Sequence, residues 1–187
     1  MARSTPVHSG YTIIHGTTSG SSAYKADTWV EYTIASQSVE NNQSRVIAYF
    51  YTALASGESS GTYDNQDGGE CQYFTVGGAS GTIYWNDGPY DYRISTPMLI
   101  AKFDGYITHN ADGTKSITIA GSYTTKSSYI SGGTISSNVT LPAIDRGLMR
   151  VKVSGTWRTG LVYVRVSGTW RLGQAYCRSG GVWRIGV

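Results

Sequence analysis

The dipeptide Trp-Arg occurs three times in the C-terminal part of the chain, at a constant spacing of 13 residues. Indole rings and guanidinium groups stack on aromatic or sugar faces, and the guanidinium also binds anions. Regularly spaced tryptophans are typical of packing, so we favour the core of an oligomer. Docking on the rest of the chain and stacking on sugars are the alternatives. The candidate contact residues are Trp157, Arg158, Trp170, Arg171, Trp183 and Arg184.

These pairs belong to a longer repeat that covers residues 151–187. A unit of 13 residues is too small to bury its own apolar face, so it must stack on copies of itself, another domain or another chain. A two-residue turn at Ser154-Gly155 would place Lys152 opposite Trp157, and equivalent pairs in the other repeats. An odd period sends successive tryptophans to opposite faces of a continuous sheet, so each repeat needs either an odd loop or a bulge. We favour a glycine bulge at Gly160 and Gly173.

Charge divides the chain at the same place. Residues 146–187 hold eight of the 15 basic groups and no acidic group, whereas residues 1–145 hold seven basic and all 12 acidic groups. The net charge of +3 therefore combines −5 in the first part with +8 in the second. Such asymmetry favours a polyanionic partner (phosphate-rich cell-wall polymers, nucleic acid or an acidic protein surface). Alternatively, the arginines only solvate a β-surface and prevent aggregation.

A cluster of aromatic residues between 84 and 92 is a second candidate site. Flat aromatic faces beside Asn and Asp side chains are what sugar recognition uses. The same residues could instead pack a loop onto the end of a sheet. The candidate glycan contacts are Tyr84, Trp85, Tyr90 and Tyr92.

The sequence lacks convincing residue patterns for catalysis, metal binding or phosphate binding. The pair Asp87 and Asp91 could act in glycoside hydrolysis but flanks a Gly-Pro turn. The histidines have no metal-ligand spacing, and the calcium-like segment 64–70 has Tyr63 at its first ligand position. No nucleophile motif or phosphate loop is present, and the arginines form no recognisable nucleic-acid motif. We therefore expect a protein that is not an enzyme and has no cofactor or metal, with nucleic acid an unlikely partner.

Composition predicts a β-protein. The sequence has 24 glycines and 15 tyrosines, with no helical period of any length. It has neither a membrane-length apolar run nor a secretory signal, which favours synthesis in a cytoplasm and no membrane contact. Cys177 occupies the repeat position of Val151 and Val164, so it fills an apolar position and a bridge to Cys71 is not expected.

Seven segments rich in β-branched and aromatic residues predict strands, separated by turn signals. Asp112-Gly113 supplies the positive φ angles of a tight hairpin turn. We expect an antiparallel β-sandwich, Ig-like or jelly-roll-like, over residues 1–145, and a small repetitive β-hairpin or meander tail over 146–187. The predicted strands are 11–15, 29–34, 45–54, 71–76, 98–109, 116–123 and 134–141.

Three segments together resemble a module of tail-associated virion proteins from siphophages and their prophages. They are Val39–Val46, which opens a long strand, the His109–Ile119 hairpin with its His-Asn-Ala-Asp-Gly-Thr-Lys motif, and the closing Leu141–Arg146. Asp145 stands where this family usually has proline. The resemblance covers roughly residues 30–146 and implies a structural β-sandwich of a phage particle, with no catalytic residues.

From these features we expect a bacteriophage virion structural protein, associated with the tail tip or a tail fibre. It would be made in the bacterial host cytoplasm, contact other virion proteins, form a homo-oligomer with a trimer favoured, and serve assembly and host attachment through a cell-surface glycan. The alternative is a stand-alone carbohydrate-binding or adhesin domain.

Overall fold

The computed structural model describes residues 4–20, 26–54, 65–90, 96–126, 130–145, 149–173 and 175–185. Throughout these residues the chain is all-β, with antiparallel strands and no helix. This confirms the all-β fold class expected from the composition. All seven predicted strands are present, most of them longer than expected.

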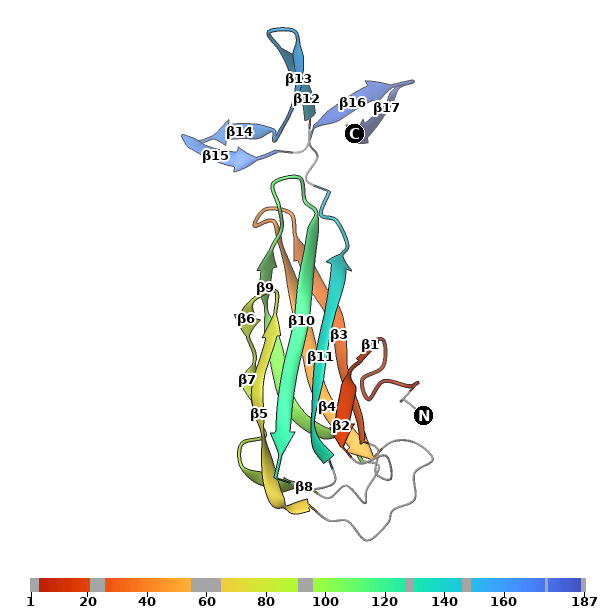
Figure 1. The fold of residues 1–187 in the computed structure, drawn as a ribbon. Helices are drawn as coiled ribbons and strands as arrows, with labels where there is room; N and C mark the ends of the chain where they lie inside the picture. Colours follow the sequence, from red (N-terminus) through yellow and green to blue (C-terminus); the bar gives the residue numbers. More distant parts are fainter. Residues whose placement is uncertain are drawn as a thin grey trace. The chain divides into compact units, whose positions relative to one another are not determined.

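One sheet contains five strands (Figure 1), in the order β1-β3-β4-β9-β7. Their bounds are Thr12–His15 (β1), Ala26–Ser38 (β3), Gln43–Leu54 (β4), Met98–Thr108 (β9) and Thr82–Ile83 (β7). A second sheet has the order β2-β11-β10-β5-β6, with β8 also paired to β5. Its strands are Thr17–Gly20 (β2), Ile130–Leu141 (β11), Lys115–Thr125 (β10), Asn65–Val76 (β5), Ala79–Ser80 (β6) and Gly88–Tyr90 (β8).

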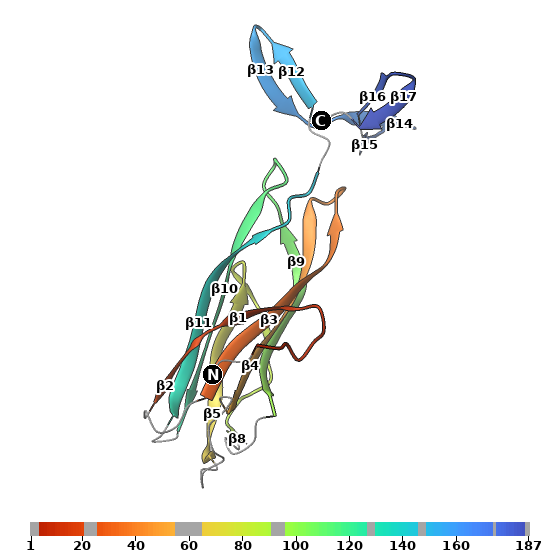
Figure 2. The ribbon, with the colours of Figure 1, turned by 90° about the vertical axis from the view of Figure 1, so that its right-hand side faces the viewer.

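The inner faces of the two sheets enclose the main hydrophobic core, and Figure 2 shows the two layers from the side. Phe50 of the first sheet stacks on Phe74 of the second, with ring centroids 5.5 Å apart. Along β10, Ile117 and Ile119 are buried while Thr118 is exposed, as the alternation of the sequence predicts. The two layers form a sandwich because each sheet buries one apolar face against the other.

The outer face of the five-stranded sheet carries a second, smaller cluster around Trp29 and Tyr51. The N-terminal segment covers it, and the ring of His8 stacks on Tyr49 at 4.2 Å. Glu31 is fully buried here and accepts hydrogen bonds from the backbone N–H of Val7 (2.5 Å) and of His8 (3.0 Å), and from Nε1 of Trp29 (3.0 Å). This carboxylate therefore ties the N-terminal segment to β3.

By its contacts the chain divides into two units. The first contains Met1–Ser36, Arg45–Ile107 and Ser116–Leu141, and the second contains Gln37–Ser44, Thr108–Lys115 and Pro142–Val187. The expected boundary at residue 145 stays a prediction. Residues 142–145, which precede it, belong to the second unit together with two loops.

The repeat folds into three separate antiparallel hairpins. Their strands are Met149–Val153 (β12), Thr156–Gly160 (β13), Tyr163–Val166 (β14), Thr169–Leu172 (β15), Tyr176–Ser179 (β16) and Val182–Ile185 (β17). Each hairpin pairs only its own two strands in the described residues. The repeat is therefore three short ribbons and not the continuous meander that was one of the two expected forms.

Candidate contact surface on the repeat hairpins

Each hairpin turns through two residues with positive φ. Ser154 and Gly155 have φ of 50° and 83°, and Ser167 and Gly168 repeat these values. Two successive positive φ angles define a type I′ turn, whose twist matches that of the flanking strands. The two-residue turn predicted at Ser154-Gly155 is confirmed.

The register of the first hairpin pairs Lys152 with Trp157 and Val151 with Arg158. The second and third hairpins repeat this register with Arg165 opposite Trp170 and Arg178 opposite Trp183. These pairings are the predicted ones. The predicted glycine bulge is wrong: the three registers run without a shift, Gly160 pairs with Met149, and Gly173 follows the end of β15.

The reason is that short connections separate the hairpins. Val162 precedes β14 and Gly173 follows β15, so both lie in connections between hairpins. The N–H of Gly173 donates to the carbonyl oxygen of Val162 at 2.8 Å. A connection resets the register between ribbons, so an odd period needs no bulge within a strand. Equivalent residues then occupy equivalent positions on all three hairpins.

Strand alternation gives each hairpin two different faces. One, called here the indole face, carries a cation opposite a tryptophan, as with Lys152 and Trp157. The other, called here the valine face, carries valines beside an arginine, as with Val164, Val166 and Arg171. Both faces are open: Trp157 and Trp170 are 64% and 65% exposed, and the valines of the first two hairpins are close to half exposed.

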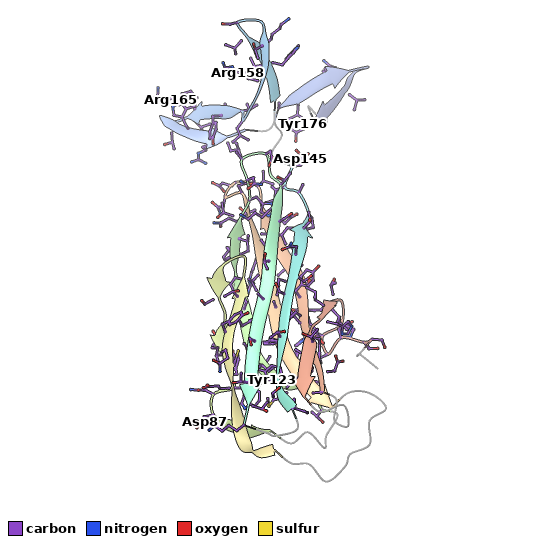
Figure 3. All side chains as sticks on the ribbon, in the orientation of Figure 1. Asp87, Tyr123, Asp145, Arg158, Arg165 and Tyr176 are labelled. Carbon is purple, nitrogen blue, oxygen red and sulfur yellow. The ribbon has the colours of Figure 1, made fainter. Side chains whose placement is uncertain are left out.

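The cation lies close to the indole in the first hairpin. Nζ of Lys152 is 6.0 Å from the ring centroid of Trp157, at the outer limit of a cation–π contact. In the second hairpin Nε of Arg165 donates instead to the carbonyl oxygen of Gly168 at 3.3 Å. Figure 3 labels Arg158, Arg165 and Tyr176, which come from three different hairpins. The side chains of Trp183, Arg184 and Cys177 lie outside the described residues.

Within the second unit, the three segments of the phage-tail resemblance meet in one hydrogen-bonded junction. Asn42, with φ of 53°, donates from Nδ2 to the carbonyl oxygens of His109 (3.0 Å) and Asn110 (2.8 Å). The N–H of Ile144 donates to the carbonyl oxygen of Gly113 at 3.0 Å. The junction thus joins the loop after β3, the hairpin between β9 and β10 and the segment that follows β11.

His109 is the buried centre of this junction. Its Nδ1 lies 2.7 Å from the carbonyl oxygen of Gly113, which can only accept, so Nδ1 carries the proton. In a neutral ring Nε2 then accepts from the hydroxyl of Ser44, at 2.7 Å. Gln37 donates to Ser44 Oγ and, at 2.8 Å, to the carbonyl oxygen of Pro142. The sequence placed His109 only at the start of the hairpin motif and did not predict this role.

The turn at the tip of this hairpin differs from the predicted one. Only Gly113 has a positive φ, of 83°, and its N–H donates to the carbonyl oxygen of Asn110 at 2.9 Å. This is a turn over Ala111 and Asp112 followed by a left-handed glycine, rather than a two-residue type I′ turn. Asp112 accepts hydrogen bonds from the N–H and hydroxyl of Thr114, and these bonds lower the pKa of its carboxyl.

Trp85, the central residue of the aromatic cluster at 84–92, does not lie at the surface as a glycan contact would require. Trp85 is 5% exposed and belongs to the main core, where its ring contacts Tyr123 with centroids 5.6 Å apart. Its Nε1 donates to the carbonyl oxygen of Gly88 at 2.7 Å. A buried ring offers no face to a sugar. Tyr84 is 56% exposed, whereas Tyr92 and the side chain of Tyr90 lie outside the described residues.

We therefore expect Trp85→Ala to act on stability. Removing a buried tryptophan should lower the free energy of unfolding by about 3–5 kcal/mol, because it leaves a cavity beside Tyr123. Tyr84→Ala is the matched control and should change stability by less than about 0.5 kcal/mol. Urea denaturation of both variants measures the difference. Equal stabilities would contradict the placement of Trp85 in the core.

The remaining candidates for chemistry are separated or paired. Asp87 forms an exposed ion pair with Lys126 at 2.5 Å, and Asp91 lies outside the described residues. Cys71 is a free, buried thiol whose pKa burial raises to about 11. In the described part of the chain, no group of three His, Cys, Asp or Glu residues is placed to hold a metal ion. Nor does that part contain a helix long and apolar enough to cross a membrane.

Comparison with family models, with curated proteins and with solved structures finds no match to this chain.

Proposed function

We propose that this chain is a structural protein of a bacteriophage virion, associated with the tail tip or a tail fibre, in which the repeat hairpins mediate assembly. The observation that carries the proposal is the contrast between the two parts of the chain. The sandwich packs most of its large apolar residues in a core and exposes a few, such as Ile83 and Tyr106, whereas the hairpins leave tryptophans and valines open on both faces. Exposed apolar residues repeated on three hairpins mark an interaction surface.

The partner that fits the valine faces best is another copy of the chain. A two-stranded hairpin is at best marginally stable in water, and three copies would supply neighbours for every ribbon. We therefore favour a homo-trimer that also contacts other virion proteins. The junction around His109 supports such a role, since it anchors the segment up to Asp145 from which the chain continues to the hairpins.

In this proposal the protein is not an enzyme, has no cofactor, and is made in the cytoplasm of the bacterial host before it joins the virion. A second candidate is a carbohydrate-binding or adhesin domain. It is favoured by the exposed Trp157 with Lys152 beside its ring, a pair that could stack on a sugar.

Mass spectrometry of particles released by the cells that encode the chain tests the virion assignment. We expect its peptides in purified particles, at a copy number that is a multiple of three. Deleting its gene should yield particles that lack a tail-tip or fibre structure. Complete absence of the peptides from purified, infective particles would contradict the proposal and favour the adhesin.

A further inference from the structure

The two faces of each hairpin have different chemistry, although both are exposed. In the first two hairpins the valine face carries β-branched side chains around one arginine, and such side chains pack well against another sheet. The indole face places a cation opposite a flat aromatic ring, as in Trp170 with Arg165 and Trp157 with Lys152. In the second hairpin it also carries Tyr163, which is 51% exposed and pairs with Leu172.

Charge indicates what kind of ligand the hairpins bind. Residues 146–187 contain no acidic group, so hairpins from neighbouring copies repel. None of the basic side chains described on the hairpins lies in an ion pair, and all of them are exposed; they are Lys152, Arg158, Arg165, Arg171 and Arg178. A ligand that carries negative charge would relieve this repulsion.

The aromatic half of the indole face restricts the ligand further. An indole that is about two-thirds exposed offers a flat apolar surface, which suits the C–H face of a sugar ring. In the second hairpin the described indole face has a single cation, Arg165, beside a single indole. Such low charge density fits a polymer whose phosphates are spaced by sugar or polyol units better than the denser phosphates of nucleic acid.

We propose that the indole faces bind a phosphate-bearing glycopolymer, with sugar rings on Trp157 and Trp170 and phosphates on Lys152 and Arg165. The third hairpin repeats the register, with Arg178 opposite Trp183. Three similar sites on one chain make binding multivalent, so weak single contacts add to a firm attachment. This inference rests on the proposed virion role and adds a host-surface ligand for the same hairpins.

The test uses full-length protein and a glycosylated poly(glycerol phosphate) as the probe, with titration calorimetry as the readout. Neutral dextran and a single-stranded oligonucleotide of matched charge are the competing ligands. We expect binding to the probe, weaker binding at high salt, and little binding to dextran. Tighter binding of the oligonucleotide would overturn the proposal in favour of nucleic acid, and equal binding of dextran would show that charge has no part.

Two double variants locate the site. Trp157→Ala with Trp170→Ala removes the stacking surfaces, and Lys152→Gln with Arg165→Gln removes the cations while keeping the indoles. Each should weaken binding about 10-fold or more. The matched control, Val164→Thr with Val166→Thr, changes the valine face only and should retain the affinity of each hairpin. Unchanged affinity in both indole-face variants would overturn the proposal.

Light scattering on the same samples separates this inference from the proposed assembly. The indole-face variants should keep the molar mass of the wild-type protein, because they leave the valine face intact. A wild-type oligomer that does not bind the probe would contradict the glycopolymer proposal and leave the proposed assembly standing. A wild-type monomer that binds the probe would contradict the proposed oligomer and support the glycopolymer as ligand.

Discussion

Glu31→Ala is expected to lower the free energy of unfolding by about 3–5 kcal/mol, although the residue is a carboxylate on a β-strand. Glu31 is fully buried, and the substitution leaves the donors of Val7, His8 and Trp29 without their acceptor. It also releases the N-terminal segment from the outer face of the sheet. Chemical denaturation measures the loss.

The matched control is Glu70→Ala, since Glu70 is exposed on β5 and should change stability by less than about 0.5 kcal/mol. The loss should come with faster hydrogen exchange of the Val7 and His8 amides. A Glu31 variant as stable as the control would contradict the role assigned to this carboxylate.

The same carboxylate predicts how stability depends on pH. Burial by itself raises the pKa of Glu31, but the hydrogen bonds from Val7, His8 and Trp29 outweigh it and hold the pKa below its ordinary value of 4.5. A group whose pKa is lowered on folding stabilises the fold fully above its unfolded pKa. That contribution is lost as the pH falls through the folded pKa. Glu31→Gln should therefore remove this part of the acid sensitivity, and an unchanged pH profile would contradict it.

Gly113→Ala is expected to open the junction around His109. At Gly113 φ is 83°, and a Cβ would lie 2.0 Å from the carbonyl oxygen of Ile144, a backbone atom. Strain in the left-handed region costs about 1–2 kcal/mol, and the clash adds to it by displacing the segment that follows β11. We expect a total loss of about 3 kcal/mol or more, with faster hydrogen exchange at Ile144 and His109.

Gly10→Ala is the control for this prediction. Gly10 has nearly the same φ, 82°, but no atom lies within 4 Å of the position of its Cβ. The control therefore measures the backbone strain alone, and the difference between the two variants measures the clash with Ile144. Equal losses of unfolding free energy in the two variants would contradict the predicted clash with Ile144.

Local sequence predicted the strands and the hairpins because their determinants are local. The alternation along β10 and the positions of Ser154-Gly155 specify faces, turn and register without reference to distant residues. The third repeat keeps the same register with Gly180-Gly181 in the turn, so positive φ, rather than the serine itself, is what the position requires.

The features that sequence did not predict all depend on distant segments. Trp85 was expected at the surface, since its neighbours Asn86 and Asp87 are polar, but a glycine on β5 makes room for its ring: a Cβ on Gly69 would lie 2.5 Å from it. Glu31 lies on the outer face of its sheet, and the N-terminal segment that covers this face was not predicted. The junction required the three segments at His109, Asn42 and Ile144 to be read as one site.

The molar mass of the full-length protein in solution, by light scattering after gel filtration, shows whether the hairpins assemble the chain. We expect a trimer, three times the chain mass of 20.2 kDa. It should fall to monomer when threonine replaces the four valines of the first two hairpins, which are Val151, Val153, Val164 and Val166. The chain of residues 1–145 should likewise be monomeric. High salt should preserve the trimer, because it screens the repulsion among the basic hairpins and strengthens apolar contacts. A full-length protein of 20.2 kDa at every salt concentration would contradict assembly through the hairpins.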